Sequence, residues 1–482
     1  MKMMKNSFTR IGFLIFFLGA SLIITGIEGY TMRAHAQEGK QEEKPAPENE
    51  AGKEKPGYQD PATCAALLND QSYKGMDAQK YMVAGKDSWV FRSRQDLKTD
   101  FSISEEDLAL YQKFSAFLKE SGMELVLVYI PTRGMIASKF LRRESEWDKN
   151  FDIAAAAKSY NATIKAMRDK GIHIIGNSNP QSPESYFNHA DQHWTTSGAR
   201  AMAEKTAAYI KANIPIASKL PQVKFETTVG KKVTYDGRFG EIIKKICKFR
   251  PDPETDLEVY TKPAGLSDDA ALFGDVPIPL VTLVGTSNSR REEFNSNFDG
   301  YLKQELSLDI LNAAIAGGGM DDSLLIYLTS SEFKKNPPRI LIWEIPGYYD
   351  LGGANMRQTI RQAMASVAGY CEKPLAEFSK KTIEDKKLKI FDKVEKEKIP
   401  AKNAYIVLNF DEEVTKDFTM SVKTDDGKHE KYEFQRRKGD DGRLWYYLPK
   451  QNRDGFFAEA TISVNDGIKG RHLQARLCPL VP

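Results

Sequence analysis

The stretch LVTLVGTSNS, residues 280–289, decides how this chain folds. Its first half, Leu280–Val284, is almost entirely apolar, which is typical of a strand buried on both faces. Gly285-Thr286-Ser287 follows directly, and a serine on a tight turn between a strand and a helix exposes its Oγ and leaves backbone N–H groups free to hold an oxyanion. The stretch predicts an α/β fold with a serine at the carboxyl end of a strand.

Strands and helices alternate on both sides of this stretch. An apolar helical period begins after a capping-box-like sequence at Ser104–Asp107 and ends at Gly122. Further helices are expected at 151–170, 196–212 and near 322–328, and further strands at 124–130, 172–175, 310–315 and 340–345. The alternation predicts one α/β domain over 58–371 with a mostly parallel sheet, whose sites lie at the carboxyl ends of strands.

The pattern changes after Cys371. Residues 372–400 are highly charged and are expected to form a helical connector. Short strands then recur between 401 and 482, which predicts a small C-terminal β-sandwich. The expected strands are 404–410, 418–422, 431–437, 443–448 and 458–464.

The first 36 residues predict a signal peptide. Lys2, Lys5 and Arg10 precede an uncharged stretch, and Ala34-His35-Ala36 has the small residues that a signal peptidase needs. The apolar run is close in length to a spanning helix, so a retained anchor is the alternative to cleavage. Residues 37–57 are rich in charge and proline, and we expect a disordered linker there.

The net charge of the chain is +3 at pH 7, and residues 1–36 account for all of it. The neutral remainder argues against a nucleic-acid partner, because non-specific binding to nucleic acid needs a large basic surface.

The part of the chain after residue 36 contains four cysteines, Cys64, Cys247, Cys371 and Cys478. An exported chain with this even number predicts two disulfides in one of three pairings, with free thiols as the alternative. No cysteine or histidine spacing indicates a metal site, and we expect no cofactor.

A second motif bears on catalysis. In Asp191-Gln192-His193, an extended backbone points the first and third side chains to one side, so the carboxylate can orient the imidazole. His189 is equally close to Asp191 in sequence, and the spacing does not choose between the two histidines. Each motif alone has an ordinary explanation, a helix cap at Ser287 and a surface hydrogen bond at Asp191, but together they predict a Ser-His-Asp triad.

These residues resemble those of SGNH hydrolases, although Asp191 and His193 here precede Ser287 and the spacing is Asp-x-His. Both departures are similar to the circularly permuted domain of the AlgX/AlgJ family of alginate O-acetyltransferases, and this similarity favours His193 over His189. Other segments that resemble the family are GKDSWVFR at 85–92, PTR at 131–133, DQHW at 191–194 and IWEIP at 342–346. The resemblance extends from about residue 60 to the end of the chain. The C-terminal β domain and the four cysteines are similar to the longer, AlgX-type members.

The resemblance implies a periplasmic enzyme that transfers acetyl groups to mannuronate hydroxyls of alginate. Ser287 would be the nucleophile, His193 the general base and Asp191 the orienting carboxylate. The oxyanion candidates are the backbone N–H of Ser287 and the side chains of Asn312 and Arg133.

The resemblance also implies the disulfides Cys64–Cys247 and Cys371–Cys478. Its implied partners are the polymer, membrane proteins that supply the acetyl group, and other proteins of the export complex. Two other functions fit the same residues. One is an acetylesterase, whose acyl-enzyme reacts with water, and the other is a non-catalytic scaffold that guides the polymer.

Alginate is a polyanion, so a neutral protein needs a local basic groove to bind it. The C-terminal region is expected to be a carbohydrate-binding domain, because basic residues predominate over 431–450. We expect Arg437, Arg443 and Trp445 to contact sugar there, and Tyr348 to line the catalytic groove. The alternative is that the two aromatic side chains belong to the core.

Overall fold

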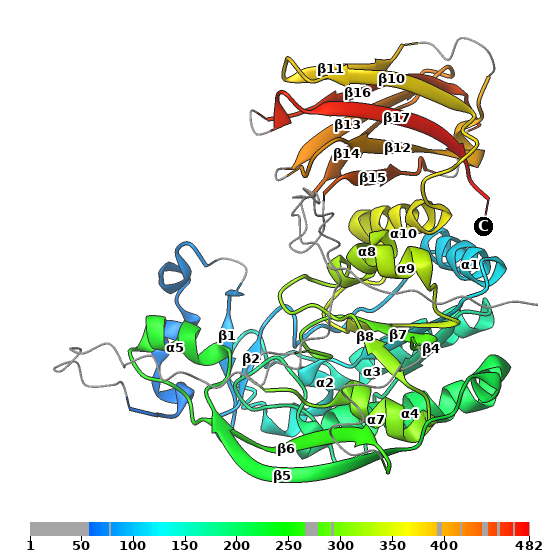
Figure 1. Ribbon diagram of the computed structural model, residues 1–482. Helices are drawn as coiled ribbons and strands as arrows, with labels where there is room; N and C mark the ends of the chain where they lie inside the picture. The colour runs from blue at the N-terminus through cyan, green and yellow to red at the C-terminus, as the bar shows by residue number, and fades with distance from the viewer. Residues whose placement is uncertain are drawn as a thin grey trace, which may run out of the picture. The chain divides into compact units, whose positions relative to one another are not determined.

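Five parallel strands form the central sheet of the structure, which is a computed structural model (Figure 1). Their order is β4-β3-β9-β7-β8. Their bounds are His173–Gly176 for β4, Glu124–Ile130 for β3, Ile340–Pro346 for β9, Val281–Val284 for β7 and Ile310–Asn312 for β8. Every residue of β7 and β9 is buried, as is usual for parallel strands covered on both faces. The α/β class and the mostly parallel sheet are therefore confirmed.

The structure describes residues 57–76, 79–265, 278–290, 294–392, 398–414, 417–435, 442–450, 454–465 and 468–481. The expected signal peptide and nearly all of the expected linker lie outside these residues. By its contacts the chain divides into Met1–Lys55 and Pro56–Pro482.

Helices cover both faces of the central sheet. Their bounds are Glu105–Glu120 for α1, Arg133–Ile136 for α2, Ile153–Asp169 for α3, Thr196–Asn213 for α4, Phe239–Cys247 for α5, Phe298–Leu306 for α7, Asp322–Thr329 for α8, Ser331–Lys335 for α9 and Gly353–Ala368 for α10. Helices α1, α8, α9 and α10 lie on one side, with α4 and α7 on the other (Figure 1). Ser104 caps α1 as the sequence predicted, because its Oγ accepts from Asp107 N at 3.1 Å, and the same hydroxyl donates to the Asp107 carboxylate at 2.6 Å.

A long antiparallel pair of strands, β5 (Phe225–Tyr235) and β6 (Glu254–Pro263), was not predicted. It packs against α4 and α7 (Figure 1). Most of its side chains are at least partly exposed, so its sequence lacks the apolar alternation by which strands are recognised. A second short pair, β1 (Met82–Ala84) and β2 (Val90–Arg92), was also not predicted.

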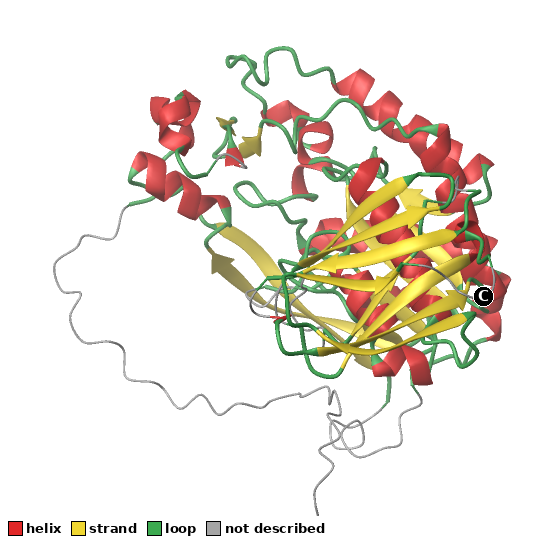
Figure 2. Ribbon diagram, turned by 90° about the horizontal axis from the view of Figure 1, so that it is seen from above, coloured by secondary structure: helices red, strands yellow, loops and turns green. Residues whose placement is uncertain are grey.

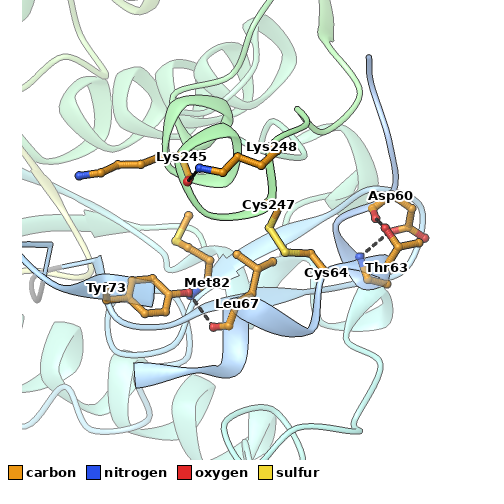
Figure 3. Close-up of a disulfide and its surroundings, with 10 residues drawn as sticks. Asp60, Thr63, Cys64, Leu67, Tyr73, Met82, Lys245, Cys247 and Lys248 are labelled. Atoms are coloured by element: carbon orange, nitrogen blue, oxygen red, sulfur yellow. Dashed lines mark hydrogen bonds between the residues drawn. A yellow bond between two sulfur atoms is a disulfide. The ribbon is translucent and has the colours of Figure 1, made fainter. Parts of the chain in front are cut away.

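The first disulfide joins Cys64, between two short 3₁₀ helices, to Cys247 at the end of α5 (Figure 3). Beside it, Tyr73 donates to the carbonyl of Leu67 at 2.7 Å and accepts from the N–H of Met82 at 2.8 Å. These bonds tie the 3₁₀ helices to β1. The disulfide thus fixes α5 to the N-terminal part of the described chain.

Two antiparallel four-stranded sheets form the C-terminal part, with orders β10-β17-β12-β15 and β11-β16-β13-β14. Their bounds are Ala376–Thr382 for β10, Lys387–Phe391 for β11, Ala404–Phe410 for β12, Phe418–Thr424 for β13, His429–Phe434 for β14, Leu444–Tyr447 for β15, Phe457–Ser463 for β16 and His472–Pro479 for β17. The sheets share one apolar core and so form a sandwich. Figure 2 views their strands from above.

The helical connector expected over 372–400 is wrong. This segment contains β10 and β11, which pair with β17 and β16 at the edges of the two sheets. Edge strands commonly bear charged side chains, which discourage pairing with other chains. Part of the charge that suggested a helix thus belongs to β10, β11 and the turn between them.

The second disulfide joins Cys371, just after α10, to Cys478 in β17. Both predicted disulfide pairings are confirmed. Among the helices of the described ranges, none combines the length and the apolar character that a membrane span requires.

Candidate active site

The three residues of the predicted triad lie in one hydrogen-bonded chain. His193 Nε2 is 2.7 Å from Ser287 Oγ, and His193 Nδ1 is 2.5 Å from Asp191 Oδ1. Asp191 is fully buried and His193 is 2% exposed, whereas Ser287 is partly exposed. With Asp191 accepting from Nδ1–H, Nε2 is left to accept a proton from the serine hydroxyl. This hydrogen-bonded arrangement of Asp191, His193 and Ser287 is suited to attack by Ser287 Oγ on a carbonyl carbon.

The turn that carries Ser287 is held by Glu344 in β9. The Glu344 carboxylate accepts from Thr286 N at 2.7 Å, from Thr286 Oγ1 at 3.0 Å and from Ser289 Oγ at 3.1 Å. A Cβ at Gly285 would lie 2.6 Å from the same carboxylate, so only glycine permits this close approach. Gly285 of the strand-turn motif is thus explained by a residue of the neighbouring strand.

Glu344 is fully buried. Burial raises the pKa of its carboxyl group from 4.5 to about 7, and its hydrogen bonds from Thr286 and Ser289 oppose this shift. IWEIP was recognised as a family-like segment, but its sequence gave no reason to assign Glu344 a role. The contact depends on β9 and β7 being neighbours in the sheet, and sequence spacing does not contain that information.

The loop that carries Asp191 and His193 is held by buried charges on its other side. Arg133 Nη2 donates to the carbonyls of Asn188 at 2.7 Å and His189 at 2.6 Å, and Nη1 bonds to Asp96 at 3.0 Å. Glu254 accepts from the N–H of His189 at 3.0 Å and of Ala190 at 2.6 Å. Buried backbone groups are normally paired in this way, and here the pairing sets the position of the loop.

Asp191 is itself oriented by α5. Its second oxygen, Oδ2, accepts from the N–H of Arg238, which precedes the first residue of α5, at 2.9 Å. The next residue, Phe239, donates its N–H to the carbonyl of Ala190 at 3.1 Å. Since Cys247 ends the same helix, the first disulfide connects the N-terminal region to the orientation of Asp191.

Trp194 links the two motifs directly. Its Nε1 donates to the carbonyl of Asn288 at 2.9 Å and to Ser296 Oγ at 2.8 Å. Its ring is almost fully buried. The residue after His193 therefore contacts the turn after Ser287, which holds the imidazole and the hydroxyl in register.

His189, the alternative to His193, has a different neighbour. Its Nδ1 lies 3.4 Å from Glu254 Oε2, and its side chain is 47% exposed. The structure thus brings His193, and not His189, to Ser287.

The oxyanion candidates differ in what they contact. Among the described residues, no acceptor bonds the backbone N–H of Ser287, whereas the N–H groups of Thr286, Asn288 and Ser289 all have acceptors. Arg133 is a wrong candidate, because its two terminal nitrogens donate to Asp96 and to loop carbonyls. The side-chain amide of Asn312 donates to the carbonyl of Ser289 at 2.9 Å, so this contact supports the turn after Ser287.

The expected sugar contacts on the sandwich are corrected by the structure. Trp445 is 1% exposed and packs against Phe418 and Phe434, so it cannot stack on a sugar. Both faces of β15 are covered, one by the sandwich core and the other by α10, which is why the expectation of one open face failed. Arg443 is exposed, and Arg437 lies outside the described residues.

Tyr348, expected in the catalytic groove, directly follows the Gly after β9. Its ring is partly buried, and the Arg92 guanidinium lies 4.4 Å from the ring centroid. Arg92 in turn pairs with Asp96 at 2.8 Å. Asp96 thus anchors both Arg92 beside Tyr348 and Arg133 behind the His193 loop.

Comparisons with known proteins identify the family of this chain. Residues 82–347 match the family model described as "SGNH hydrolase-like domain, acetyltransferase AlgX". The alginate biosynthesis protein AlgX of Pseudomonas aeruginosa is 36% identical over 332 residues, which cover 68% of this chain and 67% of that protein. The probable alginate O-acetylase AlgJ of the same organism is 30% identical over 285 residues, covering 56% and 70%.

The fold is similar to a solved structure as well. The structure of Pseudomonas aeruginosa AlgX covers 86% of this chain and 99% of its own, with a TM-score of 0.73 and 29% identity. The family model spans more than half of the chain and includes the residues of the triad. This chain belongs to the AlgX family of SGNH hydrolase-like proteins.

Proposed function

We propose that this protein is a periplasmic O-acetyltransferase that transfers acetyl groups to mannuronate hydroxyls of alginate through an acetyl-Ser287 intermediate. The observation that supports this most is the hydrogen-bonded chain from Asp191 through His193 to Ser287. It occurs in a family whose relatives are named for alginate biosynthesis and alginate O-acetylation. We also infer a circular permutation of the SGNH domain, since the Asp-x-His pair precedes the serine.

In the proposed first half-reaction, Ser287 Oγ attacks the carbonyl carbon of an acetyl donor while His193 Nε2 takes its proton. The backbone N–H of Ser287 faces the oxyanion that forms. Collapse expels the donor's leaving group, which takes the proton from His193. In the second half-reaction, a mannuronate hydroxyl at position 2 or 3 gives its proton to His193 and attacks the acetyl ester. Ser287 then recovers the proton from His193.

The test of this function is an acetylation assay. Purified protein is incubated with an activated acetyl ester and mannuronate oligomers, and the masses of the products are measured by mass spectrometry. We expect mass gains of one acetyl group on the oligomers, because the acyl-enzyme meets a sugar hydroxyl. Free acetate without acetylated sugar would indicate an esterase. Neither product, with polymer still bound, would indicate a scaffold.

We further propose that the sandwich helps to bind the polymer, at a basic hollow of about 540 Å³ formed with α1 and α10. Lys431 and Lys450 of the C-terminal part line it together with Arg357 and Arg361 of α10. Arg361 pairs with Glu430 at 2.7 Å and Arg357 pairs with Asp107 at 2.7 Å. The two lysines are exposed and have no ion-pair partner among the described residues, so they are available to sugar carboxylates.

Replacing Lys431 and Lys450 together with glutamine is expected to weaken binding of long mannuronate oligomers by about tenfold at low salt. The loss should shrink at high salt, because exposed charges are screened. Isothermal titration calorimetry measures the affinity, and Lys389→Gln on β11, outside the hollow, is the matched control. Equal affinities of the double variant and the control would contradict this site.

A further inference from the structure

A second polar pocket, of about 440 Å³, lies at the carboxyl end of β4, away from the sandwich. Asn177, the first residue after β4, lines it together with residues of the following loop and of the first half of α4. The same connection, residues 177–195, then supplies Asp191 and His193. A single loop between β4 and α4 thus forms the pocket with its first half and the acid-base pair with its second.

The side chains of this pocket suit a hydroxyl-rich ligand. Amides and hydroxyls predominate among them, and they come from Asn177, Asn179, Gln181, Ser182, Ser185 and Ser197. Asn177 is 5% exposed and Tyr186 is 1% exposed, so polar groups extend into the interior beneath the pocket. The Tyr186 hydroxyl interacts with the Asn177 side chain, and Lys205 Nζ donates to Asn177 Oδ1 at 3.4 Å. These groups therefore form a connected polar base to the pocket.

The charges in the pocket favour a negative ligand. Arg200 and Lys205 line it with one carboxylate, Glu204, which binds Arg200 Nε at 2.8 Å and leaves the other guanidinium nitrogens available. Lys205 is flanked by a third cation, Arg168. Burial lowers the pKa of Lys205, and the positive charge of Arg168 lowers it further. A ligand carboxylate would offset this local excess of positive charge.

The pocket opens at the same edge of the sheet as Ser287, because all strands of the sheet are parallel and both sites follow carboxyl ends. β3 and β9 separate β4 from β7, so the two strands are roughly 15 Å apart at about 4.8 Å per step. An isolated bridge between Phe187 and Trp194 connects the pocket loop to the residue after His193.

We propose that this pocket is a second sugar subsite, which binds the carboxylate and hydroxyls of a uronate residue several units along the polymer from the residue acetylated at Ser287. It rests on the proposed function in that the polymer is the shared ligand. A polymer that occupies both positions would be retained between successive transfers and held in a fixed register against the nucleophile.

The experiment compares Arg200→Gln/Lys205→Gln with Lys211→Gln, an exposed lysine farther along α4. Ser287 is first blocked with a sulfonyl fluoride, and calorimetry then measures the affinity for mannuronate oligomers of about ten residues. We expect binding about tenfold weaker than wild type in the double variant and unchanged in the control, while neutral mannose oligomers of equal length show no such difference. Equal affinities of the two variants would overturn the subsite.

Kinetics with unblocked protein provide the second readout. The double variant should raise KM for ten-residue oligomers with kcat unchanged, and leave both constants unchanged for trimers, which are too short to span the two sites. A rise of KM for trimers as large as that for long oligomers would overturn the proposal. If wild type acetylates neither oligomer, the proposed function fails, and the binding comparison still tests the pocket by itself.

Discussion

Replacing Ser287 with alanine is expected to lower acetyl transfer to mannuronate oligomers by at least about 10³-fold and to leave the protein folded. The side chain of Ser287 bonds to His193 Nε2, and alanine removes the attacking oxygen without adding bulk. Ser287 is only partly buried, so the substitution opens no cavity in the core, and its main structural cost is the hydrogen bond that His193 Nε2 loses. The loss should appear in kcat, because the oxygen acts in the chemical step.

Three measurements separate this result from simple damage. Circular dichroism and the melting temperature of Ser287→Ala should match wild type within a few degrees. Labelling by a sulfonyl fluoride, followed by peptide mass analysis, should modify Ser287 in wild type and leave the variant unmodified there. Ser218→Ala, an exposed serine remote from the site, is the matched control and should keep full activity. Activity of Ser287→Ala within tenfold of wild type would exclude the acyl-enzyme.

The central sheet was predictable because its strands are continuous apolar runs. Glu124–Ile130 was bounded correctly to the residue, because an apolar run of 7 residues has the length of a buried strand and is too short for a typical helix. β5 and β6 escaped detection because exposed strands need no apolar alternation. The same reason explains β10, whose charged edge resembled a helix.

The triad was predictable to the extent that its chemistry is local in sequence. Asp191 and His193 are two residues apart, and Ser287 directly follows an apolar strand. The Asp-x-His pair and the serine turn could therefore each be identified from the sequence, before the structure showed them in contact. The supports of the site were not predictable in this way. Arg133 was expected to face an oxyanion, yet it binds loop carbonyls, and the reason lies in its contact with Asp96 in a distant part of the chain. The sugar contact expected of Trp445 was wrong for a similar reason. The sequence of β15 alone does not reveal that α10 covers one of its faces and the sandwich core the other.

Glu344 is the residue whose replacement should have the next largest effect on activity. Glu344→Ala would leave the N–H and hydroxyl of Thr286 and the hydroxyl of Ser289 without their acceptor in the interior. A nucleophile displaced by about 1 Å costs roughly 10²-fold in rate, so we expect a loss of that order in kcat with KM little changed. Glu344→Gln keeps the shape and one acceptor oxygen and should retain more activity than alanine. A fully active Glu344→Ala would show that the turn holds its position without this carboxylate.

Glu344 should also leave a signature in the pH dependence of stability. Because burial raises its pKa from 4.5 to about 7 in the folded protein, the folded state binds an extra proton between these values, and stability falls as pH rises from about 4.5 to 7. The full shift corresponds to a free energy on the order of 3 kcal/mol. Denaturant unfolding at a series of pH values should therefore show wild type losing stability relative to Glu344→Gln across this window, since glutamine does not titrate. Glu120→Gln, at an exposed glutamate at the end of α1, is the matched control. A flat difference between wild type and Glu344→Gln would mean that the hydrogen bonds from Thr286 and Ser289 fully offset the cost of burying the carboxylate.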